Sequence, residues 1–298
     1  MNLERFGMDT ITLAGPLEAK LKAVREAGFG QIMLQARDIA GHPAGEAAAI
    51  AAVRASGLRV TGFQVLRDFE GLSGHLHEYK VDIAKAMLEM CHALGSRVLL
   101  ACSSVSSHST DDPAAMTRDL QKLAMLAVPY GIRIAYEALS WGRHVNELPK
   151  AWEIVAEADR ANLGVGVDSF HILAAKTAPE ELEEIDPARI VLVQLADFMW
   201  QEARSFEERI ETARHFRVFP GEGVHSAQVA DLVRRVDRMG YRGDYSLEVF
   251  NDDYVQMPLA VVAERGRRSV QWLSALTSRG GLPPRARATS SPPASPRR

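Results

Sequence analysis

The sequence predicts a single eight-stranded α/β barrel, and three observations support that prediction. Residues 1–278 of the 298-residue chain have an ordinary globular composition, and their number is close to the size typical of one such barrel. Short apolar, β-branched runs alternate with longer helical patterns, which favours a parallel sheet. Several helical patterns also end in glycine just before the next strand. An open doubly wound sheet is the lesser option, and two smaller domains remain possible on length alone.

The expected elements follow one another as strand and helix along the chain. Strands are expected at Phe6–Leu13, Gln31–Gln35, Arg59–Gln64, Arg97–Ala101, Ile132–Glu137, Gly164–Asp168, Ile190–Leu195 and Tyr245–Phe250. Helices are expected at Pro16–Ala27, Gly45–Ser56, Glu78–Leu94, Pro113–Tyr130, Glu147–Ala158, Glu180–Ile185, Ser226–Met239 and Pro258–Thr277. The glycines that end helices are Gly28, Gly57, Gly95, Gly131 and Gly240.

The open sheet can be tested at the turn after the first strand. That turn, Ala14–Leu17, lacks the G-x-G-x-x-G pattern of a dinucleotide-binding sheet, and the G-x-x-x-x-G-K-[ST] pattern occurs nowhere in the chain. Because both phosphate-binding patterns are missing, nucleotide binding through those loops has no support. The closed barrel is therefore preferred.

Residues 279–298 differ in composition from the rest of the chain. They hold five of the 14 prolines and five arginines, with no acidic residue. Such a segment cannot bury apolar surface, so we expect a disordered, basic, proline-rich tail after a barrel of residues 1–278. Removing the five positive charges of this tail from the net charge of −3 leaves −8 on the barrel. This acidity gives no electrostatic reason to bind nucleic acid.

The composition also excludes several classes of protein. No stretch reaches the ~20 apolar residues that a membrane span needs, and the segment Met1–Arg5 has no signal-peptide pattern. Only two cysteines occur, Cys91 and Cys102, so a disulfide framework is excluded and a reducing cytoplasm fits. We therefore expect a cytoplasmic protein that acts on a small molecule, without a nucleic-acid or membrane partner. A homo-oligomeric assembly stays open.

Four consecutive strands end with oxygen-bearing side chains. These are Glu137, Asp168, Gln194 and Glu248. Barrel enzymes place their chemistry at this end of the strands. Three carboxylates that converge with an amide would repel one another unless a cation joined them, and such hard oxygen ligands suit Mg²⁺, Mn²⁺ or a similar divalent ion. The alternative, that each side chain caps a helix or pairs with an arginine, explains one such residue better than four.

Charged side chains near these strand ends are candidates for further roles. His171 follows the sixth strand closely and could act as a general acid or base, or be held by a backbone carbonyl. Arg217 lies in a loop shaped by glycine and proline, where it could bind a carboxylate or phosphate, or pair with a structural acid such as Glu222. Arg67, just past the third strand, is a second candidate to bind an anion.

Two further segments flank the predicted site. The stretch Trp141–His144 has a lid-like place after the fifth strand, so both of its terminal side chains are candidates for substrate contact, although packing would explain Trp141 equally well. Cys102–Ser104 follows the fourth strand and might suggest a nucleophile. Neither a G-x-S-x-G elbow nor an obvious base accompanies it, so a place in the pocket wall is the better interpretation.

Five motifs carry a resemblance to a known family. In chain order they are Tyr136–Asn146, Val167–His171, Val193–Asp197, Arg214–Gly223 and Ser246–Asn251. From about Phe63 to Asn251 the chain resembles the bacterial 3-dehydroshikimate dehydratases, within the superfamily of xylose-isomerase-like barrels that includes sugar phosphate isomerases and epimerases. The resemblance implies a hydro-lyase of aromatic catabolism that converts 3-dehydroshikimate to protocatechuate with a divalent metal such as Mg²⁺, Mn²⁺ or Co²⁺.

The resemblance also implies roles for individual residues. The metal ligands would be Glu137, Asp168, Gln194 and Glu248. His171 would take part in proton transfer, while Arg217 and Arg67 would hold the substrate carboxylate. In this chemistry a polarised carbonyl acidifies the neighbouring C–H bond, a base removes the proton, and the enolate expels a hydroxyl group. One departure concerns the second strand, where Gln31–Asp38 replaces the acidic, aromatic stretch usual in the family.

Three other functions remain open. A metal-dependent sugar isomerase or epimerase of the same superfamily would use Glu137 and Glu248 as acid and base, although many such enzymes have histidine where Gln194 stands. A DNA-repair nuclease of the endonuclease IV type needs a histidine-rich multimetal cluster, whereas the loop histidines here lie away from the carboxylates and the barrel is acidic. A non-catalytic binding protein would keep the pocket without needing the metal.

Overall fold

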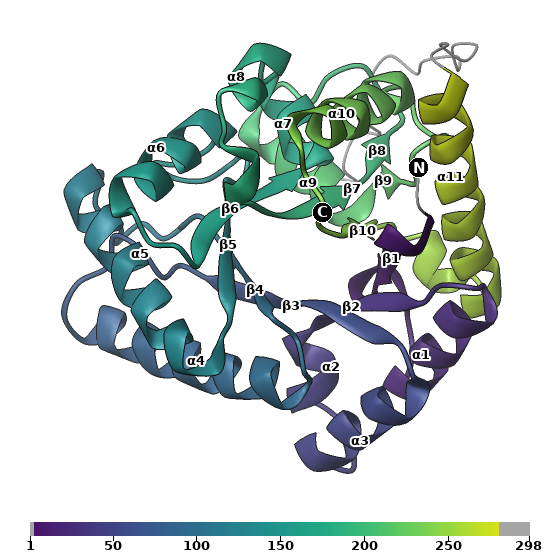
Figure 1. The fold of residues 1–298 in the computed structure, drawn as a ribbon, viewed down its shortest axis with the longest axis horizontal. Coiled ribbons are helices and arrows are strands. Elements are labelled where there is room, and N and C mark those ends of the chain that lie inside the picture. The colour runs from purple at the N-terminus through teal and green to yellow at the C-terminus, as the bar shows by residue number, and fades with distance from the viewer. Residues whose placement is uncertain (1–2, 280–298) are drawn as a thin grey trace, which may run out of the picture.

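In the computed structural model, which describes residues 3–279, eight parallel strands form a closed barrel (Figure 1). The barrel strands are β1 (Phe6–Asp9), β2 (Gln31–Gln35), β3 (Arg59–Arg67), β4 (Val98–Cys102), β5 (Arg133–Glu137), β6 (Leu163–Asp168), β7 (Ile190–Leu195) and β10 (Tyr245–Leu247). Around the barrel their order is β1-β10-β7-β6-β5-β4-β3-β2. The predicted (β/α)₈ barrel is confirmed.

Helices surround the barrel, mainly where the sequence predicts them (Figure 1). They are α1 (Leu17–Glu26), α3 (Glu46–Ser56), α4 (Gly74–Ala93), α5 (Pro113–Ala127), α6 (Leu148–Ala158), α8 (Pro179–Glu183), α10 (Ser226–Met239) and α11 (Leu259–Arg279). Strands β2 and β7 and helix α10 have the predicted bounds, and the other elements differ by a few residues at one or both ends. Helix α11 reaches Arg279, where the predicted tail begins, and residues 280–298 lie outside the described part of the chain.

Several short elements were not predicted from the sequence. They are α2 (Ala36–Ala40), α7 (Ser169–Ala175), α9 (Phe206–His215) and the antiparallel pair β8 (Asp197–Phe198) and β9 (Arg217–Val218). One-turn 3₁₀ helices lie at Leu3–Arg5, Thr10–Thr12, Val128–Tyr130, Pro187–Arg189 and Tyr254–Gln256. Helix α7 begins directly after β6, and α9, β8 and β9 all belong to the segment between β7 and α10. The two strands, α2 and α7 are too short for a periodic pattern to identify them. Helix α9 is ten residues long but buries only Thr212 and Ala213, so it lacks a clear apolar stripe.

Strands β1 and β10 are shorter than predicted, and the side chain of Thr12 explains why. After Asp9 the chain turns into a 3₁₀ helix, so the expected strand Phe6–Leu13 is wrong in its second half. The Thr12 hydroxyl donates to the Leu247 carbonyl at 3.3 Å and accepts the Val249 N–H at 2.9 Å. This side chain replaces the backbone ladder, so β10 ends at Leu247 rather than at Phe250.

The glycines predicted to end helices do so in the left-handed region of backbone conformation. All five have positive φ: Gly28, Gly57, Gly95, Gly131 and Gly240. At the end of α3, for example, Gly57 has φ +68° and its N–H bonds to the Arg54 carbonyl. Only glycine adopts this conformation without a steric cost, which is why it marks the turn from helix to strand.

Both faces of the barrel strands are buried. Every residue of β6 and β7 is buried, as expected for parallel strands that have helices outside and packed side chains inside. The core is one continuous cluster that includes Met8, Ile32, Leu100 and Val165. Within residues 3–279, no helix combines the length and the apolar character needed to cross a bilayer.

Candidate metal centre

The four predicted metal ligands come together at the C-terminal ends of neighbouring strands. Glu137 and Asp168 are the last residues of β5 and β6, Gln194 is the last but one of β7, and Glu248 follows β10. Gln194 is in register with Asp168 on one side and with Ser246 on the other. Each of the four is at most 5% exposed. Such burial of three carboxyl groups is costly unless positive charge accompanies them.

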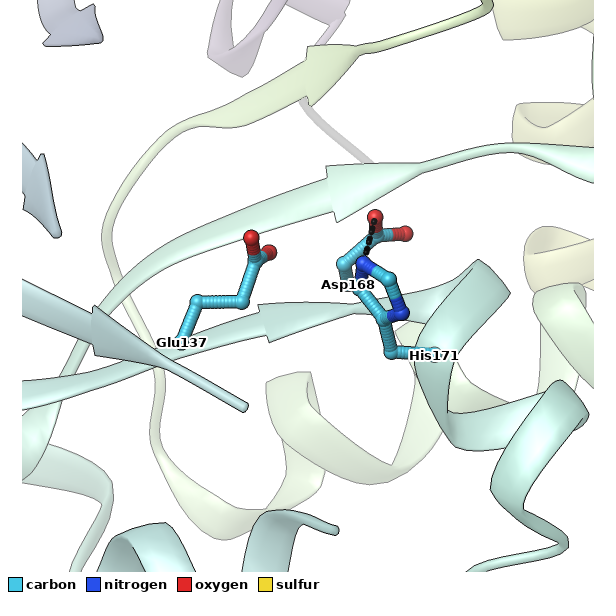
Figure 2. Close-up of side chains that lie close together, drawn as sticks. All are labelled: Glu137, Asp168 and His171. Atoms are coloured by element: carbon cyan, nitrogen blue, oxygen red, sulfur yellow. Dashed lines mark ion pairs between the residues drawn. The ribbon is translucent and has the colours of Figure 1, made fainter. Parts of the chain in front are cut away.

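Two of these carboxylates lie close to the ring of His171 (Figure 2). Glu137, Asp168 and His171 each offer a ligand atom, and these atoms lie within 4.8 Å of one another. All three side chains are buried. A group of this size can surround one ion. It shares Glu137 and Asp168 with the predicted ligand set and contains His171 in place of Glu248.

Unpartnered atoms in the cluster allow a direct test of whether these residues fit a cation. Glu137 Oε1 and both side-chain polar atoms of Gln194 are buried without a hydrogen-bond partner among the described residues. An unsatisfied buried polar group costs about 1–3 kcal/mol, and a hard divalent cation is a partner that oxygen acceptors can share. The donor set of carboxylates and an amide therefore fits a divalent ion.

The electrostatics of the cluster agree with that fit. Burial raises the pKa of the Glu137 carboxyl well above its usual range, and the charges of Asp168 and Glu248 raise it further. Burial also raises the pKa of Glu248, while the nearby Arg217 opposes the shift. Like charges held together in a dry site disfavour ionisation. The described residues therefore do not supply enough positive charge to keep the Glu137 and Glu248 carboxyl groups readily ionised.

Arg217 lies among the carboxylates rather than free in the pocket. It is 2% exposed, and its Nη1 atom donates to Asp168 Oδ2 at 2.7 Å and to Glu248 Oε2 at 2.9 Å. Its guanidinium also lies over the ring of Phe170, 4.5 Å from the centroid. Glu222, the partner that the sequence suggested as an alternative, pairs instead with Arg265. Arg217 thus pairs with two of the predicted metal ligands rather than with Glu222.

His171 is held by the loop that follows β5. The Ser140 N–H donates to His171 Nδ1 at 3.0 Å. An N–H can only donate, so in the neutral ring the proton belongs on Nε2, which lies 3.6 Å from Asp168 Oδ2. Burial lowers the pKa of His171 to about 3, and the ring is therefore neutral at pH 7. The edge-on contact with Trp141, with ring centroids 5.0 Å apart, further fixes its orientation.

A cavity of about 420 Å³ opens above the carboxylates. Its floor includes Glu137, His171, Arg217 and Glu248, and its walls include Trp141 and Phe250. Two exposed arginines, Arg67 and Arg214, also line it. A site with acidic groups at its base and two cations at its mouth can bind a small anion that carries polar oxygens at its other end.

His144 does not reach this cavity. Its Nε2 atom lies 3.0 Å from the Ser109 carbonyl oxygen, and the side chain lines a separate groove between α5 and α6. The lid-like stretch therefore turns away after Trp141. The prediction that His144 contacts the substrate has no support from its position, whereas Trp141 lies where it was expected.

Sequence reasoning missed three residues of the site, Asp9, Gln64 and Arg214, whereas Cys102 lines the cavity as its expected place in the pocket wall implies. The Gln64 amide donates to Asp9 Oδ2, and both side chains are at most 2% exposed. Asp9 ends β1 as Glu137 ends β5, so the strand-end rule would have found it had the first strand not been predicted to extend to Leu13. Arg214 carried no such signal, because α9 was not predicted.

Comparison with known proteins finds a matching family model and several similar enzymes. The model of the xylose isomerase-like TIM barrel family matches residues 21–276. A curated 3-dehydroshikimate dehydratase of Pseudomonas aeruginosa is 36% identical over 269 residues, which cover 90% of this chain and 41% of that protein. An inosose isomerase of Bacillus licheniformis is 27% identical over 191 residues, covering 61% of this chain and 64% of the isomerase. The chain thus spans about two fifths of the dehydratase.

Solved structures agree with the sequence comparison. A fusion protein of a xylose isomerase-like TIM barrel and a 4-hydroxyphenylpyruvate dioxygenase superposes with a TM-score of 0.85 at 34% identity, covering 92% of this chain and 43% of that one. The zinc-bound IOLI protein superposes with a TM-score of 0.77 at 20% identity, covering 91% and 98%, which shows the fold. The resemblance found in the five motifs is confirmed. The chain belongs to the xylose isomerase-like TIM barrel family.

Proposed function

We propose that this chain is a divalent-metal-dependent dehydratase that converts 3-dehydroshikimate to protocatechuate and water. The observation that carries the proposal is the buried cluster of Glu137, Asp168, Gln194 and Glu248 below a cavity with free arginines at its mouth. Similarity to the Pseudomonas dehydratase over 90% of the chain supports the choice of substrate. The protein would act in the cytoplasm, as its two unpaired cysteines suggest.

The four strand-end residues would hold Mg²⁺, Mn²⁺ or Co²⁺. When bound, such an ion polarises the substrate carbonyl and so acidifies the neighbouring C–H bond. Glu137 Oε1 and Gln194 Oε1 are the acceptors best placed for this role, because they have no partner among residues 3–279. Arg217 would keep Asp168 and Glu248 apart and oriented through its two short hydrogen bonds.

The geometry of His171 restricts its part in proton transfer. With Nδ1 engaged by the Ser140 N–H, the neutral ring carries a proton on Nε2 at the cavity floor. In this state the ring can donate a proton and cannot accept one at that atom. We therefore assign His171 the role of a neutral hydrogen-bond donor to a substrate oxygen, rather than the removal of the C–H proton.

Substrate binding would depend on Arg67 and Arg214. Arg217, assigned to this role from the resemblance, already pairs with two carboxylates. The two exposed arginines make no ion pair with a described residue, and both line the cavity. A guanidinium forms strong charge-assisted hydrogen bonds with a carboxylate, so these two side chains would hold the substrate's carboxylate while Trp141 and Phe250 flank its ring.

The test is incubation of the purified, metal-loaded protein with 3-dehydroshikimate. The expected result is a new aromatic ultraviolet absorbance that requires the substrate and a divalent ion and disappears with a chelator. If no aromatic product forms with Mg²⁺, Mn²⁺ or Co²⁺, the dehydratase assignment is wrong.

A second candidate function is a ketose isomerase or epimerase. The observation in its favour is the 27% identity to inosose isomerases over about three fifths of the chain. Glu137 ends β5 and Glu248 follows β10, with two strands between them in the barrel, and both line the cavity, where they could serve as a pair of acid–base groups. Failure of the dehydratase assay with product formation from a ketose would favour this activity.

A further inference from the structure

Cys102 lies beside a predicted metal ligand. It is the last residue of β4 and is in register with Glu137, the last residue of β5. Its Sγ atom is 3.1 Å from Glu137 Oε2. Both side chains are buried, with exposures of 4% and 3%, and both line the cavity. A thiol at this distance donates a weak hydrogen bond to the carboxylate.

This contact makes the two oxygens of Glu137 unequal. Oε2 accepts from Cys102, whereas Oε1 has no partner among the described residues although it is fully buried. We propose that Cys102 is a positioning residue, which fixes the Glu137 carboxylate so that Oε1 alone is presented to the metal. This inference rests on the proposed metal site and goes beyond it, because it assigns a role to the thiol and a binding mode to the carboxylate.

The position of Cys102 is specific, as a comparison with the second cysteine shows. Cys91 is equally buried, in α4, but its thiol lies 3.7 Å from the Ser96 carbonyl oxygen and 3.5 Å from that of Val98. It touches no predicted ligand. Among residues 3–279, the hydrogen bond that the Glu137 carboxylate accepts comes from Cys102, so loss of this donor leaves Oε2 without a partner as well. Partners of this kind orient metal ligands, and their loss typically weakens metal binding ~10–100-fold.

The experiment compares Mn²⁺ binding to four forms of the full chain at pH 7 by electron paramagnetic resonance of the free ion. The forms are the natural protein, Cys102→Ala, Cys102→Ser and the matched control Cys91→Ala. Cys102→Ala removes the donor, and we expect its Kd for Mn²⁺ to rise about tenfold. Cys102→Ser keeps a donor, so its Kd stays within about threefold of the natural value. Cys91→Ala leaves the Kd unchanged.

Several outcomes would overturn the proposal. One is a Kd for Cys102→Ala equal to that of the natural protein. Another, which applies even if Cys102→Ala does not fold, is a tenfold loss in Cys102→Ser, because the hydroxyl group still donates. A third comes from the Co²⁺-loaded natural protein: a sulfur-to-cobalt charge-transfer band would show that Cys102 is itself a ligand. We expect no such band.

The result separates this inference from the proposed function. If the natural protein binds no Mn²⁺, both the metal site and the role of Cys102 are wrong. If Mn²⁺ binds and Cys102→Ala weakens it, while 3-dehydroshikimate is not consumed, the role of Cys102 stands and the dehydratase assignment alone fails.

Discussion

At the scale of single residues, the two kinds of arginine in the site differ in what they can still bind. Arg217 is 2% exposed and bridges two carboxylates, so a substrate anion would have to displace an existing ion pair. Arg67 and Arg214 are exposed at the cavity and form no such pair within the part of the chain that the structure describes. We therefore assign substrate binding to Arg67 and Arg214, and the positioning of the two carboxylates to Arg217.

Substitution of Arg214 should weaken substrate binding without slowing the chemical step. A charge-assisted hydrogen bond contributes about 1.5–3 kcal/mol, so Arg214→Gln and Arg67→Gln should each raise KM for 3-dehydroshikimate about tenfold or more, with kcat nearly unchanged. Steady-state kinetics measures both constants. Arg204→Gln, at an arginine whose side chain is 79% exposed and which does not line the cavity, is the control. Unchanged KM in both cavity variants would contradict this assignment.

The single buried carboxyl group of Glu70 should make the stability of the folded protein depend on pH. Burial raises its pKa to about 7, although the Tyr136 hydroxyl and the Ser104 N–H donate to Oε1. Because the folded protein keeps this proton to higher pH than the unfolded chain, the free energy of unfolding falls between pH 4.5 and 7, by about 3 kcal/mol.

The measurement is urea unfolding of the natural protein and of Glu70→Gln at pH 4.5 and pH 8. Glutamine does not titrate, so the variant should lose less stability than the natural protein as pH rises. Glu147→Gln, at a side chain that is 44% exposed, is the control and should follow the natural protein. Parallel curves for all three proteins would rule out a titrating Glu70.

At the scale of elements, the ends of β1 and β10 depend on one hydroxyl group. Thr12 donates to the Leu247 carbonyl and accepts from the Val249 N–H, directly on either side of Glu248. Thr12→Val keeps the shape of the side chain but removes both hydrogen bonds, and should lower the free energy of unfolding by about 2 kcal/mol. Chemical denaturation measures this loss.

Thr212 is the matched control for that substitution. It is equally buried, in α9, but its hydroxyl has no hydrogen-bond partner among the described residues. Thr212→Val should therefore be neutral or stabilising, because it removes an unsatisfied polar group. Equal losses in the two variants would show that the Thr12 hydrogen bonds contribute nothing specific.

The elements also show what the sequence could predict and what it could not. Strands β2 and β7 were predicted residue for residue, because each is a continuous apolar run between clear turns. The four residues predicted as metal ligands could be selected because a polar residue at or near the end of such a run is conspicuous. The β8–β9 pair was missed because two-residue strands show no period, and helix α9 was missed because only Thr212 and Ala213 of its ten residues are buried. The positions of Arg214 and Arg217 could not be predicted either, because they depend on how that segment folds back over the barrel.

The contacts between side chains could not be predicted from the sequence either. Position along a strand placed Glu137 and Asp168 at one end of the barrel, but it could not reveal that Arg217 bridges Asp168 and Glu248. Nor could it show that His144 turns toward the Ser109 carbonyl. Such contacts join residues far apart in the chain, and many alternative pairings satisfy the same composition.

At the scale of the whole molecule, the metal should contribute to folding stability. A ligand that binds only the folded state at 100 times its Kd adds about 2.7 kcal/mol, so saturating Mn²⁺ should raise the Tm by about 5 °C relative to the chelated protein. Differential scanning calorimetry measures the shift. In Glu248→Gln the shift should largely disappear, whereas in Glu70→Gln, which alters a buried carboxyl outside the cluster, it should remain. A full shift in Glu248→Gln would contradict the four-ligand assignment.

The two oxygens of Asp168 link folding to chemistry in one side chain. Oδ1 accepts the Phe170 N–H at 2.8 Å and so begins helix α7, while Oδ2 faces Arg217 and His171. A substitution there would disturb the start of the helix that carries His171 as well as the ion site. One carboxylate therefore serves the fold through Oδ1 and the predicted metal centre through Oδ2.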